Sequence, residues 1–169
     1  MSGPEILPIE PSLFRGPDGA NAPLLHLNND HATELSFVDA ERMAHLVGEA
    51  FMAGRIGDAD ALLLAFDQDA DYDSPNFLWF RERFPRFVYV DRVVVAPAMR
   101  GRGLARLLYD ALFQRAAEAD HDRVVCEVNS DPPNPASDAF HAALGFTEVG
   151  AAHLAGRGKT VRYLCRALP

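Results

Sequence analysis

Cysteine is scarce in this sequence, with two in 169 residues, and no apolar run is long enough to span a membrane. Cys126 and Cys165 cannot form the disulfide framework of a small secreted protein, so we expect buried free thiols in a reducing compartment. A membrane helix needs about 20 apolar residues, and charge or proline interrupts every long apolar stretch here. The first residues also lack the layout of a secretion signal. These absences predict a cytoplasmic protein without a membrane partner.

Positive charge is also in short supply. The net charge is −8, which argues against a nucleic-acid partner held through phosphate contacts. Residues 1–90 carry 15 acidic and 6 basic side chains, whereas residues 91–169 carry 9 acidic and 10 basic ones. The acidic first half suits a cationic partner and the second half an anionic one, unless the surface acids serve only to keep the protein soluble.

The length and composition suit one globular domain. A chain of 169 residues that is 49% hydrophobic and 24% charged can build one core. We therefore predict a single domain over residues 1–169, without an internal repeat. Its first 23 residues hold five of the 12 prolines and are expected to form an irregular leader.

Hydrophobic periodicity predicts alternating helices and strands along this domain. The expected helices are residues 39–52, capped by Asp39, residues 104–119, and residues 135–144, which end at Gly145. One or two helical turns are expected within residues 77–84. The expected strands are residues 24–28, 61–66, 87–95, 123–128, 146–151 and 160–167. Strand 87–95 is apolar at odd and even positions alike, which is typical of a strand covered on both faces.

A glycine-rich segment, Arg100-Gly-Arg-Gly, links strand 87–95 to the following helix. The first amides of a helix lack intrahelical acceptors and carry partial positive charge, so they bind anions. Gly101 and Gly103 let the backbone approach a phosphate closely, and Arg100 and Arg102 can add charge-assisted contacts. The segment therefore predicts a site for a ligand that carries phosphate.

Other glycine motifs fit this segment less well. A P-loop needs glycine, four residues and then Gly-Lys-Ser/Thr, which the chain lacks. A dinucleotide fingerprint needs glycine where Arg106 stands, and an acid about 20 residues further on. The remaining alternative is structural, with glycines that only make a tight turn between strand and helix.

Residues 95–105, Val-Ala-Pro-Ala-Met-Arg-Gly-Arg-Gly-Leu-Ala, resemble the signature of the GNAT N-acetyltransferases. That pattern is Gln or Arg, two residues, Gly, one residue, and then Gly or Ala, and Arg100, Gly103 and Ala105 occupy its positions. The resemblance implies that Val93, Val94 and Val95 pair with the pantetheine arm of acetyl-CoA. It also implies that backbone amides of one segment hold the pyrophosphate of the coenzyme: Arg100, Gly101, Arg102, Gly103, Leu104 and Ala105.

A second match lies downstream, in residues 134–146. The run Asn134-Pro-Ala-Ser-Asp-Ala-Phe-His-Ala-Ala-Leu-Gly-Phe146 is similar to a later segment of the same family, usually Asn, six residues, Tyr, three residues, Gly-Phe. The spacing is met without a gap, and His141 stands where the family usually has tyrosine. By this resemblance Asn134 belongs to the coenzyme site. The specific resemblance covers about residues 87–150.

The resemblance implies an α/β fold, with a mixed, mostly antiparallel sheet of about seven strands and helices on both faces. The coenzyme would enter a wedge between strands 87–95 and 123–128. The implied reaction moves an acetyl group from acetyl-CoA to an amine of a small molecule or peptide, by direct attack in a ternary complex. Cys126 lies mid-strand and is expected to be buried rather than nucleophilic. Many members of the family are dimers, so a homodimer is also expected.

Three residues are candidates for moving protons. His141 can protonate the departing thiolate because the pKa of histidine lies near neutrality. Otherwise His141 only lines the core or surface, and the thiolate leaves unaided or takes a proton from solvent. Asp91 and Glu127 lie inside apolar strands, where charge is costly unless it is paired or functional. Either acid can deprotonate the amine, unless Arg92 and Arg123 merely compensate them.

The acceptor pocket is expected to come from the first half of the chain. Its candidate residues are Asn28, Asn29, Tyr72, Asn76, Phe77, Trp79 and Phe80, although aromatic residues at this spacing also build cores. No metal site is predicted, because His26, His31 and His45 lack metal-ligand spacing. Two alternatives to an enzyme are a non-catalytic acyl-CoA-binding module, motivated by the missing tyrosine, and a regulatory domain for another phosphate ligand.

Overall fold

Seven strands form one sheet within residues 3–31 and 35–169, the part of the chain that the computed structural model describes. They are β1 (Ile6–Pro8), β2 (Met52–Ile56), β3 (Ala61–Asp67), β4 (Val88–Val95), β5 (Arg123–Asp131), β6 (Thr147–Leu154) and β7 (Lys159–Ala167). Their order in the sheet is β1-β2-β3-β4-β5-β7-β6. Only β4 and β5 run parallel among these neighbours. The predicted mixed, mostly antiparallel sheet is confirmed.

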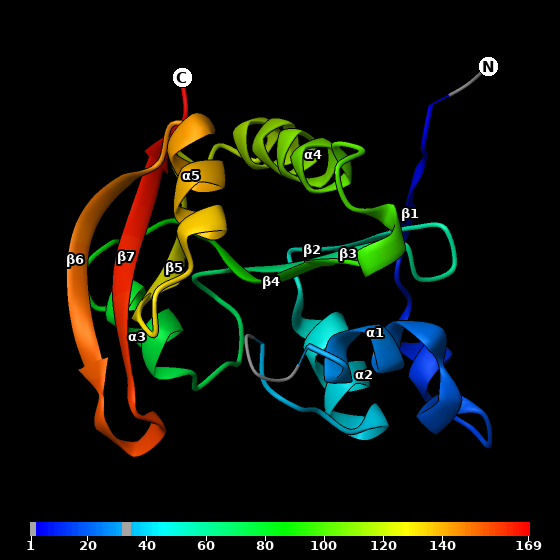
Figure 1. The fold of residues 1–169 in the computed structure, drawn as a ribbon. Coiled ribbons are helices and arrows are strands. Elements are labelled where there is room, and N and C mark those ends of the chain that lie inside the picture. The colour runs from blue at the N-terminus through cyan, green and yellow to red at the C-terminus, as the bar shows by residue number, and fades with distance from the viewer. Residues whose placement is uncertain (1–2, 32–34) are drawn as a thin grey trace.

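Helices cover both faces of this sheet (Figure 1). They are α1 (Pro23–Asn29), α2 (Ala40–Glu49), α3 (Pro75–Arg81), α4 (Leu104–Glu118) and α5 (Pro135–Ala143). Single 3-10 turns lie at Pro11–Phe14, Gly19–Asn21, Pro97–Met99 and Ala155–Arg157. Helices α4 and α5 build one buried apolar cluster with the sheet, and α1, α2 and α3 build a second cluster on the opposite face.

The elements predicted for the second half of the chain are confirmed with small shifts of their ends. Gly145 follows α5 with a φ of +88°, and its amide donates to the Ala142 carbonyl oxygen. This left-handed position is one that glycine adopts readily, so it ends the helix as the sequence indicates.

Residues 24–28, predicted as a strand, form helix α1 instead. Pro23 lies in its first turn, where the fixed φ of proline suits a helix. Leu24, Leu25, Leu27 and Asn28 are buried at helical spacing. The prediction was wrong because a short apolar run does not by itself distinguish a strand from a buried helix.

The N-terminal half contains two strands that the sequence analysis missed. The Asp39 cap of α2 is confirmed, with its Oδ1 accepting from the Arg42 amide at 2.7 Å, but the helix ends before extended Ala50, and β2 follows. The leader is not wholly irregular, because β1 pairs with β2 at the edge of the sheet. Pro8 suits such an edge strand. Residues 1–2 of the predicted leader lie outside the described residues.

Strands β4 and β5 diverge after a short ladder of paired residues. Their pairing joins only Val88 to Val124 and Tyr89 to Val125, although both strands continue well beyond these residues. This divergence leaves the second half of β4 unpaired on the side that faces β5. The wedge that the resemblance implied is therefore present between these two strands.

A β-bulge in β4 lies at Asp91. Ala65 of β3 faces Val90 and Leu64 faces Arg92, so Asp91 has no partner in the ladder. A bulge bends its strand and reverses which face the following side chains occupy. Asp91 lies at this reversal, and its side chain contacts Tyr72 and Arg92.

Gly150 of β6 lies against the indole of Trp79, which itself stacks on Tyr163 with ring centroids 4.1 Å apart. A Cβ at Gly150 would lie 2.4 Å from Trp79 Cζ2. We expect Gly150→Ala to lower the free energy of unfolding by about 1–3 kcal/mol, because the rigid ring must leave its stack. Urea unfolding measures this. Gly156→Ala, which meets no atom within 4 Å, is the matched control, and an equal loss there would contradict the explanation.

Candidate active site

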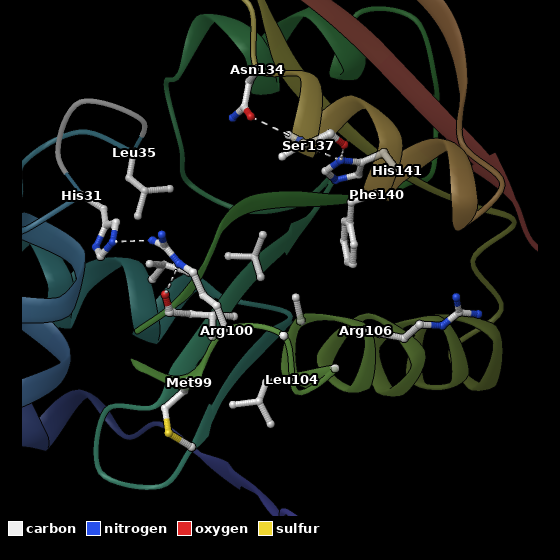
Figure 2. Close-up of a pocket in the computed structure, with 17 residues that line it drawn as sticks. His31, Leu35, Met99, Arg100, Leu104, Arg106, Asn134, Ser137, Phe140 and His141 are labelled. Atoms are coloured by element: carbon white, nitrogen blue, oxygen red, sulfur yellow. Dashed lines mark hydrogen bonds between the residues drawn. The ribbon is translucent and has the colours of Figure 1, made fainter. Parts of the chain in front are cut away.

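The wedge between β4 and β5 opens into a cavity of about 660 Å³, called the large cavity below. This volume is in the range that holds a sizeable organic ligand. Its walls come from the unpaired half of β4, the glycine-rich segment and α5 (Figure 2). The predicted coenzyme residues that line it are Val93, Val94, Val95, Arg100, Gly101, Gly103, Leu104, Ala105 and Asn134. Arg102 is exposed and is not among the lining residues.

The glycine-rich segment presents its backbone to this cavity. Gly101 and Gly103 have φ values of +79° and +75°, and a Cβ at either position would meet no atom within 4 Å. Gly103 is also the residue before α4, and no side chain caps that end of the helix. The first amides of α4 are therefore available to an anion, with the helix dipole favouring negative charge there.

Arg100 reaches across the mouth of the large cavity to His31 (Figure 2). Its Nη2 lies 3.0 Å from His31 Nε2, and its Nε donates to the Val95 carbonyl oxygen at 3.4 Å. The guanidinium is exposed, so it can move to an incoming phosphate at little cost.

Asn134 has two structural roles, one in the wall of the large cavity and one as a helix cap. It lines the large cavity, and its Oδ1 accepts from the Ser137 amide at 3.2 Å as the N-cap of α5. The cap fixes the start of the helix that carries His141 toward the cavity (Figure 2).

His141 is buried, and both of its ring nitrogens have partners. Nδ1 lies 2.8 Å from the Ser137 carbonyl oxygen, which can only accept, so Nδ1 carries the hydrogen. Nε2 lies 2.8 Å from the hydroxyl of Tyr109 and accepts from it. Burial lowers the pKa of His141, which favours this neutral form. Sequence reasoning did not single out Tyr109, which belongs to α4.

A middle cavity of about 140 Å³ continues from the large one toward the core. The two cavities share Val93 and His141, among other residues. Asp91, Tyr109 and Glu127 line the middle cavity as well. All three predicted proton-transfer residues, His141, Asp91 and Glu127, are therefore brought to one place.

A polar cavity of about 310 Å³ opens on the other side of the sheet, where α2 and the start of α3 lie. It shares Asp91, Arg92 and Glu127 with the middle cavity. These side chains form the wall that the two cavities share, so the cavities adjoin from opposite faces of the sheet at the opening between β4 and β5.

Glu127 is held by two neutral donors. Tyr89 donates its hydroxyl hydrogen to Oε2 at 2.6 Å, and Asn76 donates to Oε1 at 3.1 Å. Burial, aided by the charge of Asp91, raises the pKa of Glu127 to about 7, although the two hydrogen bonds act in the opposite direction. A carboxylate with this pKa can accept a proton near neutral pH and release it again.

Asp91 has a different environment, because a buried cation pairs with it. Arg92 Nε lies 2.8 Å from Asp91 Oδ2, and the exposed fractions of the two side chains are only 3% and 5%. Tyr72 donates to the other carboxylate oxygen at 2.6 Å. Arg92 in turn donates to Asn28 Oδ1 at 2.9 Å. Arg123, the other arginine considered as a compensating charge, pairs with Asp122 instead.

The predicted acceptor residues divide into two groups. Tyr72 and Asn76 line the polar cavity. The others support the fold: Asn28 holds Arg92, Asn29 bonds the backbone of Val38, Trp79 stacks on Tyr163, and Phe77 and Phe80 are fully buried. The walls of the polar cavity also include residues that sequence reasoning missed, namely Ser36, Phe37, Arg42 and Arg157. Phe37 is 70% exposed, a signal that only the structure provides.

The described residues contain no group of three His, Cys, Asp or Glu side chains that could hold a metal ion. In the same part of the chain, no helix is both long and apolar enough to cross a membrane. Cys126 is buried and Cys165 partly buried, and both are free thiols.

Comparison with known proteins shows which family the sequence resembles. The profile of the acetyltransferase (GNAT) family matches residues 24–146. A phosphinothricin N-acetyltransferase from Streptomyces coelicolor is 42% identical over 65 residues. This match covers 38% of the chain and spans 37% of the length of that relative.

Solved acetyltransferase structures share the fold. The ribosomal-protein-S18-alanine N-acetyltransferase from Escherichia coli superposes with a TM-score of 0.67 at 15% identity, over 98% of this chain and 94% of that one. A putative acetyltransferase, yncA, from Salmonella typhimurium, solved with its cofactor acetyl-CoA, has a TM-score of 0.68 at 19% identity, over 99% and 95%. At these identities the likeness concerns the fold alone.

Proposed function

Because this chain belongs to the acetyltransferase (GNAT) family, we propose that it transfers the acetyl group of acetyl-CoA to an amine of a small molecule or peptide. The observation that carries the proposal is a row of three adjoining cavities that share wall residues across the sheet. An anion site lies at one end, a polar pocket lies at the other, and Glu127 stands between them. This is the arrangement that a reaction between two separately bound substrates requires.

The large cavity fits the coenzyme. The open amides around Gly103 suit its pyrophosphate, and Arg100 and Arg102 lie close enough in sequence to add positive charge. The unpaired backbone of β4 from Val93 to Val95 suits the amide groups of the pantetheine arm, in the way an added strand pairs with a sheet edge. The bound coenzyme supplies an activated thioester, and its acetyl end is directed toward the middle cavity.

Glu127 is the proposed base. An amine must lose a proton when it attacks the thioester, and Glu127 lies where the cavity for the acceptor meets the middle cavity. Asp91 is better suited to hold Arg92 and Tyr72 in place, because it pairs with a buried cation, whereas both donors to Glu127 are neutral. Cys126 is a poor nucleophile, since burial raises the pKa of its thiol well above the usual value. Direct transfer in a ternary complex follows.

The acceptor binds in the polar cavity. Its inner end carries Glu127 and the Asp91–Arg92 pair, while Arg42 and Arg157 belong to its walls. The cavity thus offers both signs of charge, so the acidity of the first half of the chain does not by itself select a polyamine. The curated relative is named for phosphinothricin, which makes that compound one acceptor to test. Location in the cytoplasm and assembly as a homodimer are further proposals, and light scattering tests the dimer.

The experiment that tests the function measures thiol release from acetyl-CoA with a panel of amines: phosphinothricin, amino acids, polyamines, aminoglycosides and peptides with free N-termini. We expect thermal stabilisation by acetyl-CoA and turnover with at least one amine. Binding without turnover would favour the non-catalytic module. Stabilisation by nucleotides but not by coenzyme A would favour a domain for another phosphate ligand.

A further inference from the structure

The acetyl transfer proposed above leaves a thiolate that needs a proton. His141 occupies the position of the usual tyrosine, but its single ring hydrogen is donated to the Ser137 carbonyl oxygen, and Nε2 is an acceptor. The ring therefore has no free N–H group to offer to sulfur. Tyr109, whose hydroxyl contacts Nε2, also lines the middle cavity, and its phenol is a stronger acid than the hydroxyl of Ser137 or the amides of Asn129 and Asn134 there.

We propose that Tyr109, reaching the middle cavity from α4, is the group that protonates the departing thiolate, and that His141 is the residue that positions it. The assignment rests on the proposed function and deepens it. The proton donor is still a phenol, but it comes from α4 rather than α5. His141, at the usual tyrosine position on α5, accepts the hydrogen bond of this phenol.

The ring of Tyr109 has a fixed position. The residue is fully buried, and its ring packs against Phe113, Phe140 and Phe146 with centroids 5.5 to 6.0 Å away. Its hydroxyl oxygen lies 2.8 Å from His141 Nε2. With the ring held in this way, the hydroxyl hydrogen can still rotate about the C–O bond, from His141 toward a sulfur in the cavity. His141 thus keeps the donor aimed until the thiolate forms.

Burial shifts the acidity of Tyr109 and that of a thiol in the same cavity in the same direction. Burial, together with the charges of Cys126 and Glu127, raises the pKa of Tyr109 well above its usual value. Burial likewise raises the pKa of the Cys126 thiol, which lies in the wall of the same cavity. A coenzyme thiolate in this cavity is therefore also a stronger base than in water, and proton transfer from the phenol to the thiolate is closer to balance.

The protons and electrons of the cycle balance without another reactant. The amine nitrogen forms a bond to the acetyl carbon and gives its proton to Glu127. The carbon–sulfur bond breaks, its electron pair stays on sulfur, and sulfur takes the proton of Tyr109. The resulting phenolate regains a proton from the Glu127 carboxylic acid, which lines the same cavity. This return is strongly downhill, because the pKa of Glu127 is about 7.

Tyr109→Phe tests the assignment, since it removes only the hydroxyl group. We expect kcat to fall about tenfold to a hundredfold, at or below the lower end of the range for acid–base catalysis, with acetyl-CoA binding retained. His141→Phe is expected to lower kcat by a smaller factor. The double variant should match Tyr109→Phe alone, because His141 acts through Tyr109. Tyr163→Phe also removes a buried hydroxyl, so it shows how much folding stability such a loss costs without removing the phenol of Tyr109.

A second variant keeps the shape of the side chain and changes its acidity. With 3,5-difluorotyrosine at position 109, the phenol is a stronger acid than the natural side chain, so the pH at which kcat falls on the alkaline side should move downward. The groups that face this phenol, Cys126, Glu127 and His141, are unchanged. An unaltered pH profile, or full activity of Tyr109→Phe, would overturn the assignment and leave the proposed function standing. A natural protein that binds acetyl-CoA but never turns over would overturn both.

Discussion

Glu127→Gln is expected to lower kcat about 10³-fold and to leave acetyl-CoA affinity close to that of the natural protein. The change keeps the shape of the side chain but removes the proton acceptor at the meeting point of the middle and polar cavities. General bases contribute about 10²–10⁴-fold to rates, so a loss within this range is the signature of the role. Steady-state kinetics with an acceptor from the panel gives kcat, and isothermal titration gives the affinity.

The pH profile makes this prediction sharper. The pKa of Glu127 is raised to about 7, and the carboxyl must be ionised to accept a proton. Activity should therefore rise as the pH increases through 7, and this limb should be absent in Glu127→Gln with the same amine. Glu118→Gln at the exposed end of α4 controls for the loss of one negative charge. If Asp91→Asn removes the limb and Glu127→Gln does not, the base is Asp91.

Gly103→Val is expected to weaken acetyl-CoA binding about 100-fold or more. A β-branched residue does not tolerate a φ of +75°, so the segment must change its backbone conformation and withdraw amides from the pyrophosphate. Each charge-assisted hydrogen bond contributes about 1.5–3 kcal/mol, and the loss of two accounts for the factor. Titration calorimetry with coenzyme A measures the dissociation constant.

The matched control for this variant is Gly16→Val. Gly16 has a φ of +86° and also has no atom within 4 Å of a built Cβ, but it does not line the large cavity. It should lose a similar amount of folding stability and keep its affinity for coenzyme A. Equal affinities in the two variants would mean that the amides around Gly103 do not hold the coenzyme.

The grouping of the proposed coenzyme residues around the large cavity was predictable because one short segment carries most of them. Gly101, Gly103 and the adjoining strand are contiguous in sequence, and their local geometry follows from glycine and a helix start. The two motifs, about 30 residues apart, also placed Asn134 and His141 on the same cavity. Motifs of this kind determine local backbone structure, so the same residues predict the same local geometry in different sequences.

The rest of the site depends on contacts that no local pattern records. Tyr109 meets His141 only because α4 and α5 pack on the same face of the sheet, and its sequence context is that of any core residue. The bulge at Asp91 has no glycine or proline to mark it. Helix α1 and strand β2 were misassigned because short apolar runs obtain their conformation from the core they join.

The parting of β4 and β5 has a consequence for inhibitor design and for the order of events. In the proposed reaction, donor and acceptor approach through separate cavities on opposite sides of the sheet, so either product could depart while the other is still bound. A bisubstrate compound that links an amine to the coenzyme sulfur would occupy the large cavity and the polar cavity together. It would contact both cavities at once and should discriminate this enzyme from proteins that recognise the nucleotide alone.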